Sequence, residues 1–397
     1  MAIELRAPTN HEWPDVYAVD ARAFGASYTA EEIERKRPLH DMSRFRIAVD
    51  RRHIVGVAGS YALDATLPGG ASVPMGGITW VSVAVTHRRQ GLMRRLIGAI
   101  HDDIDGRDEP LASLYASEGG IYHHVGYGPA TQVRVTAIDP RFTRMRAECV
   151  PAAGTVGYLE GDEIVAAVDA IWQRFRTVRA GEAAKSRSDH EFFVESGKIA
   201  SDGYTASTYL AHRDGYAVYR TKMQWNDGHP AHSVFVSEFA AVTSEAHAAL
   251  WHALLSLDLV GSITSRIVPI DDPLPSLLEN PRALRTTDLN DGAWLNVRDV
   301  TRCFGARTYR SADRIVVEVD GIRWAIDGGP DGASCKIVRS KPDLFASHGA
   351  FSSLLYGGVL PSALVAGRRM QARNNDVLAR ADIFFTTSLA PHCQSQY

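Results

Sequence analysis

Residues Trp80–Ile104 have the sequence WVSVAVTHRRQGLMRRLIGAIHDDI, and this stretch decides the fold of the chain. Its first part alternates through Val81, Val83 and Val85, a pattern that predicts a strand. A basic turn with one glycine follows at 87–91. Apolar residues then recur at helical spacing, at Leu92, Leu96, Ile97, Ile100 and Ile104. The stretch therefore predicts a strand, a tight turn and a helix that begins at the turn.

The start of this helix has the features of a phosphate-binding site. A helix start carries unpaired backbone N–H groups and the positive end of the helix dipole, and both attract anions. Gly91 would let a diphosphate approach the backbone closely. Arg88, Arg89 and Arg94 add positive charge around it. The alternative is an ordinary amphipathic helix with a solvated basic start.

The turn resembles the acetyl-CoA loop of the GCN5-related N-acetyltransferases, the GNAT family, whose pattern is R/Q-x-x-G-x-G/A. Arg88 takes the first position and Gly91 the fourth, whereas Met93 departs from the small residue expected last. Strands are predicted at 45–49, 54–63, 73–85 and 111–116, with the helix at 91–105 before the last of them. This order is the one expected of a GNAT core.

Composition excludes several other classes of function. The chain has 397 residues, of which 45% are hydrophobic and 22% charged, as in ordinary globular proteins of two or three domains. A net charge of −3 gives no reason to expect nucleic acid or an anionic membrane as a partner. No run approaches the ~20 apolar residues of a membrane helix, and the N-terminus lacks an apolar signal core, so we expect a cytoplasmic protein. The four scattered cysteines predict neither a disulfide framework nor a metal site: Cys149, Cys303, Cys335 and Cys393.

A second informative segment, residues 117–130, reads SEGGIYHHVGYGPA. Two glycines open a short helix, and Gly126 closes it. In GNAT enzymes a tyrosine on this helix lies beside the thioester sulfur, where a phenol with a pKa near ~10 can protonate the leaving thiolate. Tyr122 and Tyr127 are both candidates, and for Tyr127 plain packing is the preferred interpretation. A catalytic base at His123 or His124 is conceivable but less favoured.

A closer resemblance rests on the strings THRRQGLMRRL and YASEGGIYHHVGYGPAT. These are similar to the enhanced intracellular survival (Eis) acetyltransferases of actinobacteria, and WPDV and DPLPSLL extend the resemblance along the chain. Those enzymes acetylate amines, including aminoglycosides. The resemblance implies acetyl-CoA as cosubstrate without a metal, Tyr122 as general acid, and a homo-oligomer that is hexameric. It assigns cofactor contacts to Val81, Ser82, Val83, Arg88, Arg89, Gln90, Gly91, Leu92, Met93, Arg94, Ser117 and Glu118.

We expect a mixed α/β (α+β) fold in three domains. Residues 1–148 form the catalytic GNAT domain, and 149–287 repeat the order strand, helix, strand. The second domain has VTSEAHAAL where the first has THRRQGLM, so it lacks the glycine and both arginines and places Glu245 against a diphosphate. It is therefore a degenerate GNAT-like domain, with an unrelated α/β domain as the alternative. Residues 288–397 predict a strand-rich sheet followed by helices, which resembles a sterol carrier protein domain.

The C-terminal residues 389–397 would ordinarily be frayed. In Eis enzymes the terminal carboxylate enters the active site and accepts the substrate proton, which assigns this role to the carboxylate of Tyr397. An α-carboxyl with a pKa near ~3.5 is ionised at neutral pH and can act as a base. Gln396 beside it and Ala26 in the expected lid leave the site without acids there, which favours weaker or more selective aminoglycoside acetylation.

The residues and the resemblance together predict an acetyl-CoA-dependent N-acetyltransferase that transfers acetyl directly to a primary amine within a ternary complex. A protein-lysine acetyltransferase is one rival and would act on lysine peptides but not on small polyamines. A sensor that binds CoA or a lipid is the other, and it would bind acetyl-CoA without turnover.

Overall fold

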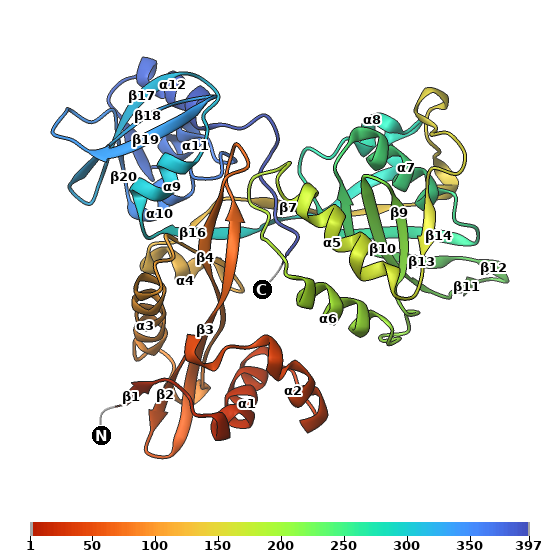
Figure 1. Ribbon diagram of the computed structural model, residues 1–397, viewed down its shortest axis with the longest axis horizontal. Helices are drawn as coiled ribbons and strands as arrows, with labels where there is room; N and C mark the ends of the chain where they lie inside the picture. The colour runs from red at the N-terminus through yellow and green to blue at the C-terminus, as the bar shows by residue number, and fades with distance from the viewer. Residues whose placement is uncertain (1–2, 396–397) are drawn as a thin grey trace. The chain divides into compact units, whose positions relative to one another are not determined.

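The computed structural model describes residues 3–395, so the predicted functions of Gln396 and Tyr397 lie outside the described residues. The described chain folds into two compact units (Figure 1). The first comprises residues up to 130, residues 293–386 and Ser395, and the second comprises residues 131–292 and 387–394. Within 3–395, no helix has both the length and the apolar character needed to cross a membrane.

The first unit is built on a seven-stranded sheet in the order β1-β2-β3-β4-β5-β16-β6. Its strands are β1 (Glu4–Arg6), β2 (Phe45–Asp50), β3 (His53–Thr66), β4 (Ser72–Val83), β5 (Leu111–Tyr115), β16 (Ala293–Val297) and β6 (Gly128–Pro129). Its helices are α1 (Trp13–Phe24), α2 (Ala30–Lys36), α3 (Leu92–Gly106) and α4 (Gly119–Tyr122). Neighbouring strands β1 to β4 are antiparallel, whereas β4 and β5, which flank α3 in sequence, are parallel.

Helices α1 and α3 cover opposite faces of this sheet (Figure 1). Ile47 and Val49 of β2 pack with Trp13 and other residues of α1, whereas Ala48 between them packs with the apolar residues of α3. Successive side chains of a strand point to opposite faces, so the short alternating strand serves both cores. The helical spacing seen in 92–104 thus corresponds to the buried face of α3.

The second unit repeats this plan on a sheet in the order β15-β7-β14-β13-β10-β9-β8. Its strands are β15 (Leu284–Asp291), β7 (Gln132–Ile138), β14 (Val260–Val268), β13 (His232–Ala241), β10 (Gly215–Lys222), β9 (Thr208–His212) and β8 (Gly157–Leu159), with a separate hairpin of β11 (Trp225–Asn226) and β12 (His229–Pro230). Its helices are α5 (Glu163–Phe175), α6 (Arg187–Gly197), α7 (Ser244–Leu255) and α8 (Leu274–Leu277). Helix α7 packs in one core, and α5 and α6 pack in the other.

A five-stranded sheet, β19-β18-β17-β20-β21, completes the first unit. It is formed by β17 (Asp313–Val319), β18 (Ile322–Gly329), β19 (Gly332–Ile337), β20 (Leu344–Ala346) and β21 (Met370–Ala372), with helices α9 (Val300–Ala306), α10 (His348–Ser352), α11 (Pro361–Ala366) and α12 (Asn375–Phe385). Arg307 is fully buried here and donates to the carbonyls of Leu354, Leu355 and Phe385 at 2.7–2.8 Å. It neutralises backbone acceptors that would otherwise be orphaned near helix ends.

Two strands join sheets other than those expected from their place in the sequence. β7 was expected within the first domain, 1–148, but pairs with β14 and β15 in the second sheet. β16 was expected to open the third domain, 288–397, but pairs with all of β5 in the first sheet. The division of the chain therefore falls near 131 and 293. Local periodicity predicts a strand but not its partner, because pairing depends on backbone groups distant in sequence.

Candidate active site

Strands β4 and β5 of the first sheet diverge after a short paired stretch. They pair in parallel at Met75–Gly77 only, while β4 stays paired to β3 as far as Val83. A bulge at Trp80, whose φ is +56°, shifts the register of β4 against β3 at this point. From Val81 to Val83, the edge of β4 on the β5 side thus pairs with no strand of the described chain. An extended ligand could pair with this edge like an added strand.

β4 leads into the turn and then into α3. Arg89 and Gly91 both have left-handed backbone conformations, with φ of +62° and +75°. Among residues 3–395, no side chain caps the start of α3, and a Cβ built on Gly91 would meet nothing within 4 Å. Arg88, Arg89, Gln90 and Arg94 are exposed around this start. The turn therefore offers open, uncapped backbone N–H groups and nearby guanidinium groups, which suit a diphosphate.

Three residues that are predicted to contact the cofactor have side chains that pack in the protein interior. Leu92 is buried, Met93 packs against the same apolar core, and Ser82 is 4% exposed. A contact between Leu92 or Ser82 and a cofactor would have to use their backbone groups. Ser117 and Glu118, in contrast, are exposed at the start of α4.

Tyr122 closes α4 and lies in the same core as the residues of β4 and α3. Its side chain is 4% exposed and packs in a cluster with Leu92, against which Val81 and Val83 also pack. Burial raises the pKa of the Tyr122 phenol, a hydrogen bond with Ser117 lowers it, and the Glu118 carboxylate raises it further. The net direction is upward, so the phenol stays protonated across the neutral range, as a proton donor requires.

The other tyrosine and the two histidines of this segment have different surroundings. Tyr127 is fully buried, and its hydroxyl lies 2.9 Å from Nε2 of His101, which agrees with a packing role. His123 contacts the Arg369 guanidinium at 2.8 Å from Nδ1, and burial and this cation lower the pKa of His123. His124 is exposed. The neutral state of His123 is favoured, but its nearest polar neighbour is Arg369 and not Tyr122.

Sequence reasoning missed a buried polar group beside β4. Asp20 of α1 is 8% exposed, and burial raises its pKa to about 6 although the Ser82 hydroxyl opposes this shift. His40 lies 3.1 Å from the hydroxyls of both Tyr17 and Tyr61, and burial lowers the pKa of His40 to about 4. The charged residue on the helical face of 13–24 was the available signal, since a carboxylate rarely occupies a buried position without a partner.

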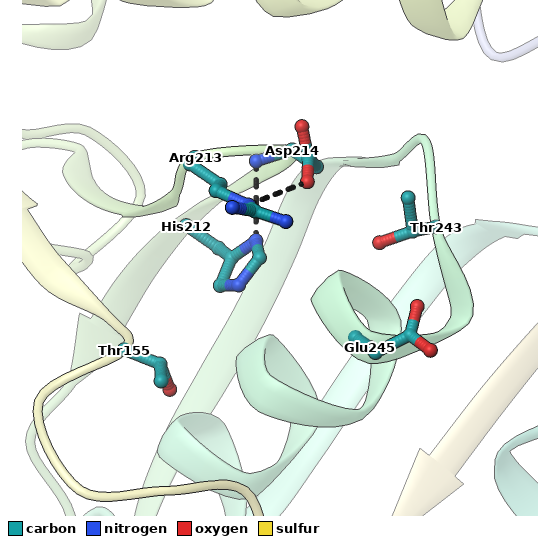
Figure 2. A pocket seen from close by; sticks show the side chains of 6 residues that line it. All are labelled: Thr155, His212, Arg213, Asp214, Thr243 and Glu245. Carbon is teal, nitrogen blue, oxygen red and sulfur yellow. Dashed lines mark hydrogen bonds and ion pairs between the residues drawn. The ribbon is translucent and has the colours of Figure 1, made fainter.

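The second unit has a helix, α7, in the position that α3 has in the first unit, but different residues surround its start. α7 connects the parallel strands β13 and β14, as α3 connects β4 and β5. The Thr243 side chain accepts the Ala246 N–H, and Glu245 lies in the first turn. These two residues line a cavity of about 330 Å³ with the hairpin residues His212, Arg213 and Asp214 (Figure 2). Arg213 is paired with Asp214 at 3.0 Å, so the cavity offers a diphosphate a capped helix and two carboxylates.

Comparisons with known proteins give a family match in each half of the chain. Residues 4–130 match a family described as acetyltransferase (GNAT) domain, and residues 169–298 match another family of the same description. The chain is therefore an N-acetyltransferase with a mixed α/β fold and tandem GNAT domains.

Relatives along the whole chain narrow this class. N-acetyltransferase Eis of Mycobacterium tuberculosis and that of Mycobacterium bovis are each 33% identical over 401 residues, 98% of both chains. Eis1 from Mycobacterium abscessus has a similar structure, with a TM-score of 0.86, 28% identity and coverage of 99% of this chain and all of that one. The chain belongs to the Eis family of N-acetyltransferases. A GCN5-related N-acetyltransferase from Anabaena variabilis has a TM-score of 0.84 over both full chains at 17% identity, a likeness of fold alone.

Proposed function

We propose that the first GNAT domain transfers the acetyl group of acetyl-CoA directly to a primary amine of a small molecule. The observation that carries the proposal is the continuity of three features. The edge of β4 at 81–83, which has no strand partner within the described chain and whose Val83 carbonyl accepts from Arg88 Nε at 3.4 Å, leads to the arginine-rich start of α3. Tyr122 lies in the same apolar cluster as residues of both. These are the parts that a thioester with a pantetheine arm and a diphosphate requires.

The residues of the chain fit this cosubstrate. Backbone groups of Val81, Ser82 and Val83 would pair with the pantetheine amides, and the N–H groups at Gly91–Arg94 would bind the diphosphate. Arg88, Arg89 and Arg94 would neutralise its charge, and Gln90, Ser117 and Glu118 would border it. Acetyl-CoA supplies the activated carbonyl, and no metal is needed for that chemistry.

Two proton transfers accompany the attack of the amine on the carbonyl. As the new C–N bond forms and the C–S bond breaks, the Tyr122 phenol donates its proton to the departing sulfur. The attacking nitrogen loses a proton, which the carboxylate of Tyr397 would accept directly or through water. Charge and protons then balance, because one proton enters at sulfur and one leaves from nitrogen.

Aminoglycosides are the acceptors we propose first. The chain is similar to the Eis family over its whole length, and this resemblance implies aminoglycosides among the amines that are acetylated. A protein lysine is the second acceptor, and a sensor without turnover is the alternative of another class. We also propose that the 313–385 sheet and helices form a sterol carrier protein-like domain and that the chain assembles as a homo-oligomer, with a hexamer expected.

The test is thiol release from acetyl-CoA in Tyr122→Phe, measured with aminoglycosides, polyamines and lysine peptides. We expect kcat to fall by about 10²- to 10⁴-fold, the usual contribution of a general acid. The dissociation constant for acetyl-CoA should change little, since the ring remains in the apolar core. Tyr158→Phe, at an exposed position of the second unit, is the matched control. Unchanged turnover in Tyr122→Phe would show that Tyr122 is not the general acid. Binding of acetyl-CoA by the wild type without turnover would favour the sensor.

A further inference from the structure

Residues Thr387–Gln394 belong to the second unit, and Ala390, His392 and Gln394 of this segment make specific contacts there. The Arg179 guanidinium donates to the Ala390 carbonyl at 2.6 Å and to Asp271 at 2.6 Å. The other oxygen of Asp271 accepts the Ala390 N–H at 2.8 Å. One ion pair thus binds both backbone groups of a single residue of the segment.

The middle of the segment lies against a glycine. The His392 N–H donates to the Ala180 carbonyl at 2.9 Å, and the His392 ring donates from Nε2 to the Ile267 carbonyl at 2.9 Å. Gly181 has φ of +100°, and a Cβ built there would lie 2.9 Å from the His392 carbonyl oxygen. The backbone of the segment therefore occupies space that any side chain at 181 would take.

The end of the segment is bound through Gln394. Its side-chain amide pairs with Phe239 of β13 in both directions, accepting from the N–H at 3.2 Å and donating to the carbonyl at 3.0 Å. Its own N–H donates to the Glu182 carboxyl, at 3.2 and 3.3 Å from the two oxygens. Glu182 is fully buried, and burial, which outweighs the cations Lys185 and Arg179, raises its pKa to about 8.

We propose that the second GNAT-like domain is a binding site for an extended peptide and that its ligand is the C-terminal segment of this chain. We call the site the tail clamp and define it as Arg179, Gly181, Glu182, Phe239 and Asp271. Its contacts go to backbone groups of the segment and to the one amide of Gln394, the pattern by which proteins bind extended peptides. The domain whose helix start does not suit a diphosphate thus has a different ligand.

The position of the clamp gives it a catalytic consequence that rests on the proposed role of the terminal carboxylate. The boundary between the units falls between Gln394 and Ser395, three residues before the chain ends. Fixing Gln394 confines the terminal carboxylate to the reach of three residues, about 10 Å. Gln394 is then a positioning residue, because it restricts the carboxylate without touching the substrate.

Alkylation of Cys393 tests the clamp without reference to activity. Cys393 lies inside the bound segment and is 6% exposed, whereas Cys149 is half-buried and Cys303 and Cys335 are buried in the first unit. In the full-length protein, we expect Gly181→Ala and Gln394→Ala to raise the iodoacetamide labelling rate of Cys393 by about tenfold. Gln394→Ala removes two hydrogen bonds to Phe239, and Gly181→Ala places a Cβ against the His392 carbonyl. Protection of Cys303 and Cys335 reports that the first unit remains folded.

Gly154→Ala is the matched control for strain. Gly154 also has a positive φ, +78°, in the second unit, but a Cβ there meets nothing within 4 Å. Its labelling pattern should equal that of the wild type. Wild-type Cys393 that reacts as fast as Cys149, or equal rates in Gly154→Ala and both clamp variants, would overturn the proposal.

Turnover measured on the same samples separates the two ideas. Faster Cys393 labelling with a fall in kcat at saturating acetyl-CoA supports both the clamp and the terminal base. Faster labelling with kcat unchanged supports the clamp and overturns the role of the Tyr397 carboxylate.

Discussion

Replacing Glu182 by glutamine should change how the stability of the second unit depends on pH. Glu182 has a pKa of about 8 in the folded chain, against an ordinary value of 4.5. Because the folded pKa is the higher, the neutral carboxyl favours folding, and this contribution is complete below pH 4.5 and lost as the pH rises through about 8. Glutamine keeps the size and an acceptor for the Gln394 N–H but cannot ionise.

The size of the effect follows from the separation of the two pKa values. Each pH unit between them costs the wild type about 1.4 kcal/mol of unfolding free energy that the variant does not lose. Over the whole window the Glu182→Gln variant should gain several kcal/mol on the wild type, on the order of 5 kcal/mol. The fully buried carboxyl is not screened by solvent.

The assay is urea unfolding at pH 5, 6.5 and 8 (values within the window), with a brief deuterium pulse at one common pH. Mass spectrometry of peptides from β10 then reports the second unit alone. Glu191→Gln is the control, since Glu191 is exposed on α6 and pairs with the exposed Arg187. Its pH dependence should follow the wild type. The reasoning would be refuted if the free energy of unfolding depended on pH in the same way in Glu182→Gln and the wild type. It would also be refuted if the extra stability of the variant grew toward acid pH.

Three further predictions concern the first unit. Gly91→Ala adds left-handed strain of about 1–2 kcal/mol without a clash, so KM for acetyl-CoA should rise in steady-state kinetics while kcat is retained. Arg307→Met orphans three buried carbonyls and should lower the free energy of unfolding by about 3 kcal/mol or more in denaturant titrations; Arg314→Met, at an exposed ion pair, should cost less than about 0.5 kcal/mol. Arg369→Ala releases the short helix α4 from its contact at His123, so kcat should fall by about tenfold with the KM for acetyl-CoA unchanged, and equal kinetics would contradict a positioning role.

The parts of the fold that were predictable are those encoded locally. The strand, turn and helix at 80–104 lie within one short stretch, and their hydrophobic periods change at the turn. The prediction of tandem GNAT domains is confirmed by the two family matches. The pairing of β16 with β5 was not predictable, because about 180 residues separate the two strands and either face of the segment could have been buried.

The candidate site was predictable at the level of backbone position but less so at the level of side chains. The expected contact between Ser82 and the cofactor stays a prediction, and the buried side chain of Ser82 leaves only its backbone groups for it. Alternation along β4 gives two opposite faces but does not say which one a helix will cover. The contacts of Gln394 with Phe239 could not be predicted from the sequence either, since a polar tail has the same composition whether it is frayed or bound.

The two helix starts show how one fold can support two kinds of recognition. At α3, Gly91 and the absence of a capping side chain leave backbone N–H groups for an external anion. At α7, Thr243 uses one of these groups and Glu245 supplies the negative charge that the helix dipole favours, so an anionic ligand gains little there. A helix start of this kind leaves the second unit without an evident use for a diphosphate-bearing cosubstrate. The backbone of β13 at Phe239, beyond its pairing with β14 at His232–Val236, and the segment between α5 and α6 bind the tail there instead.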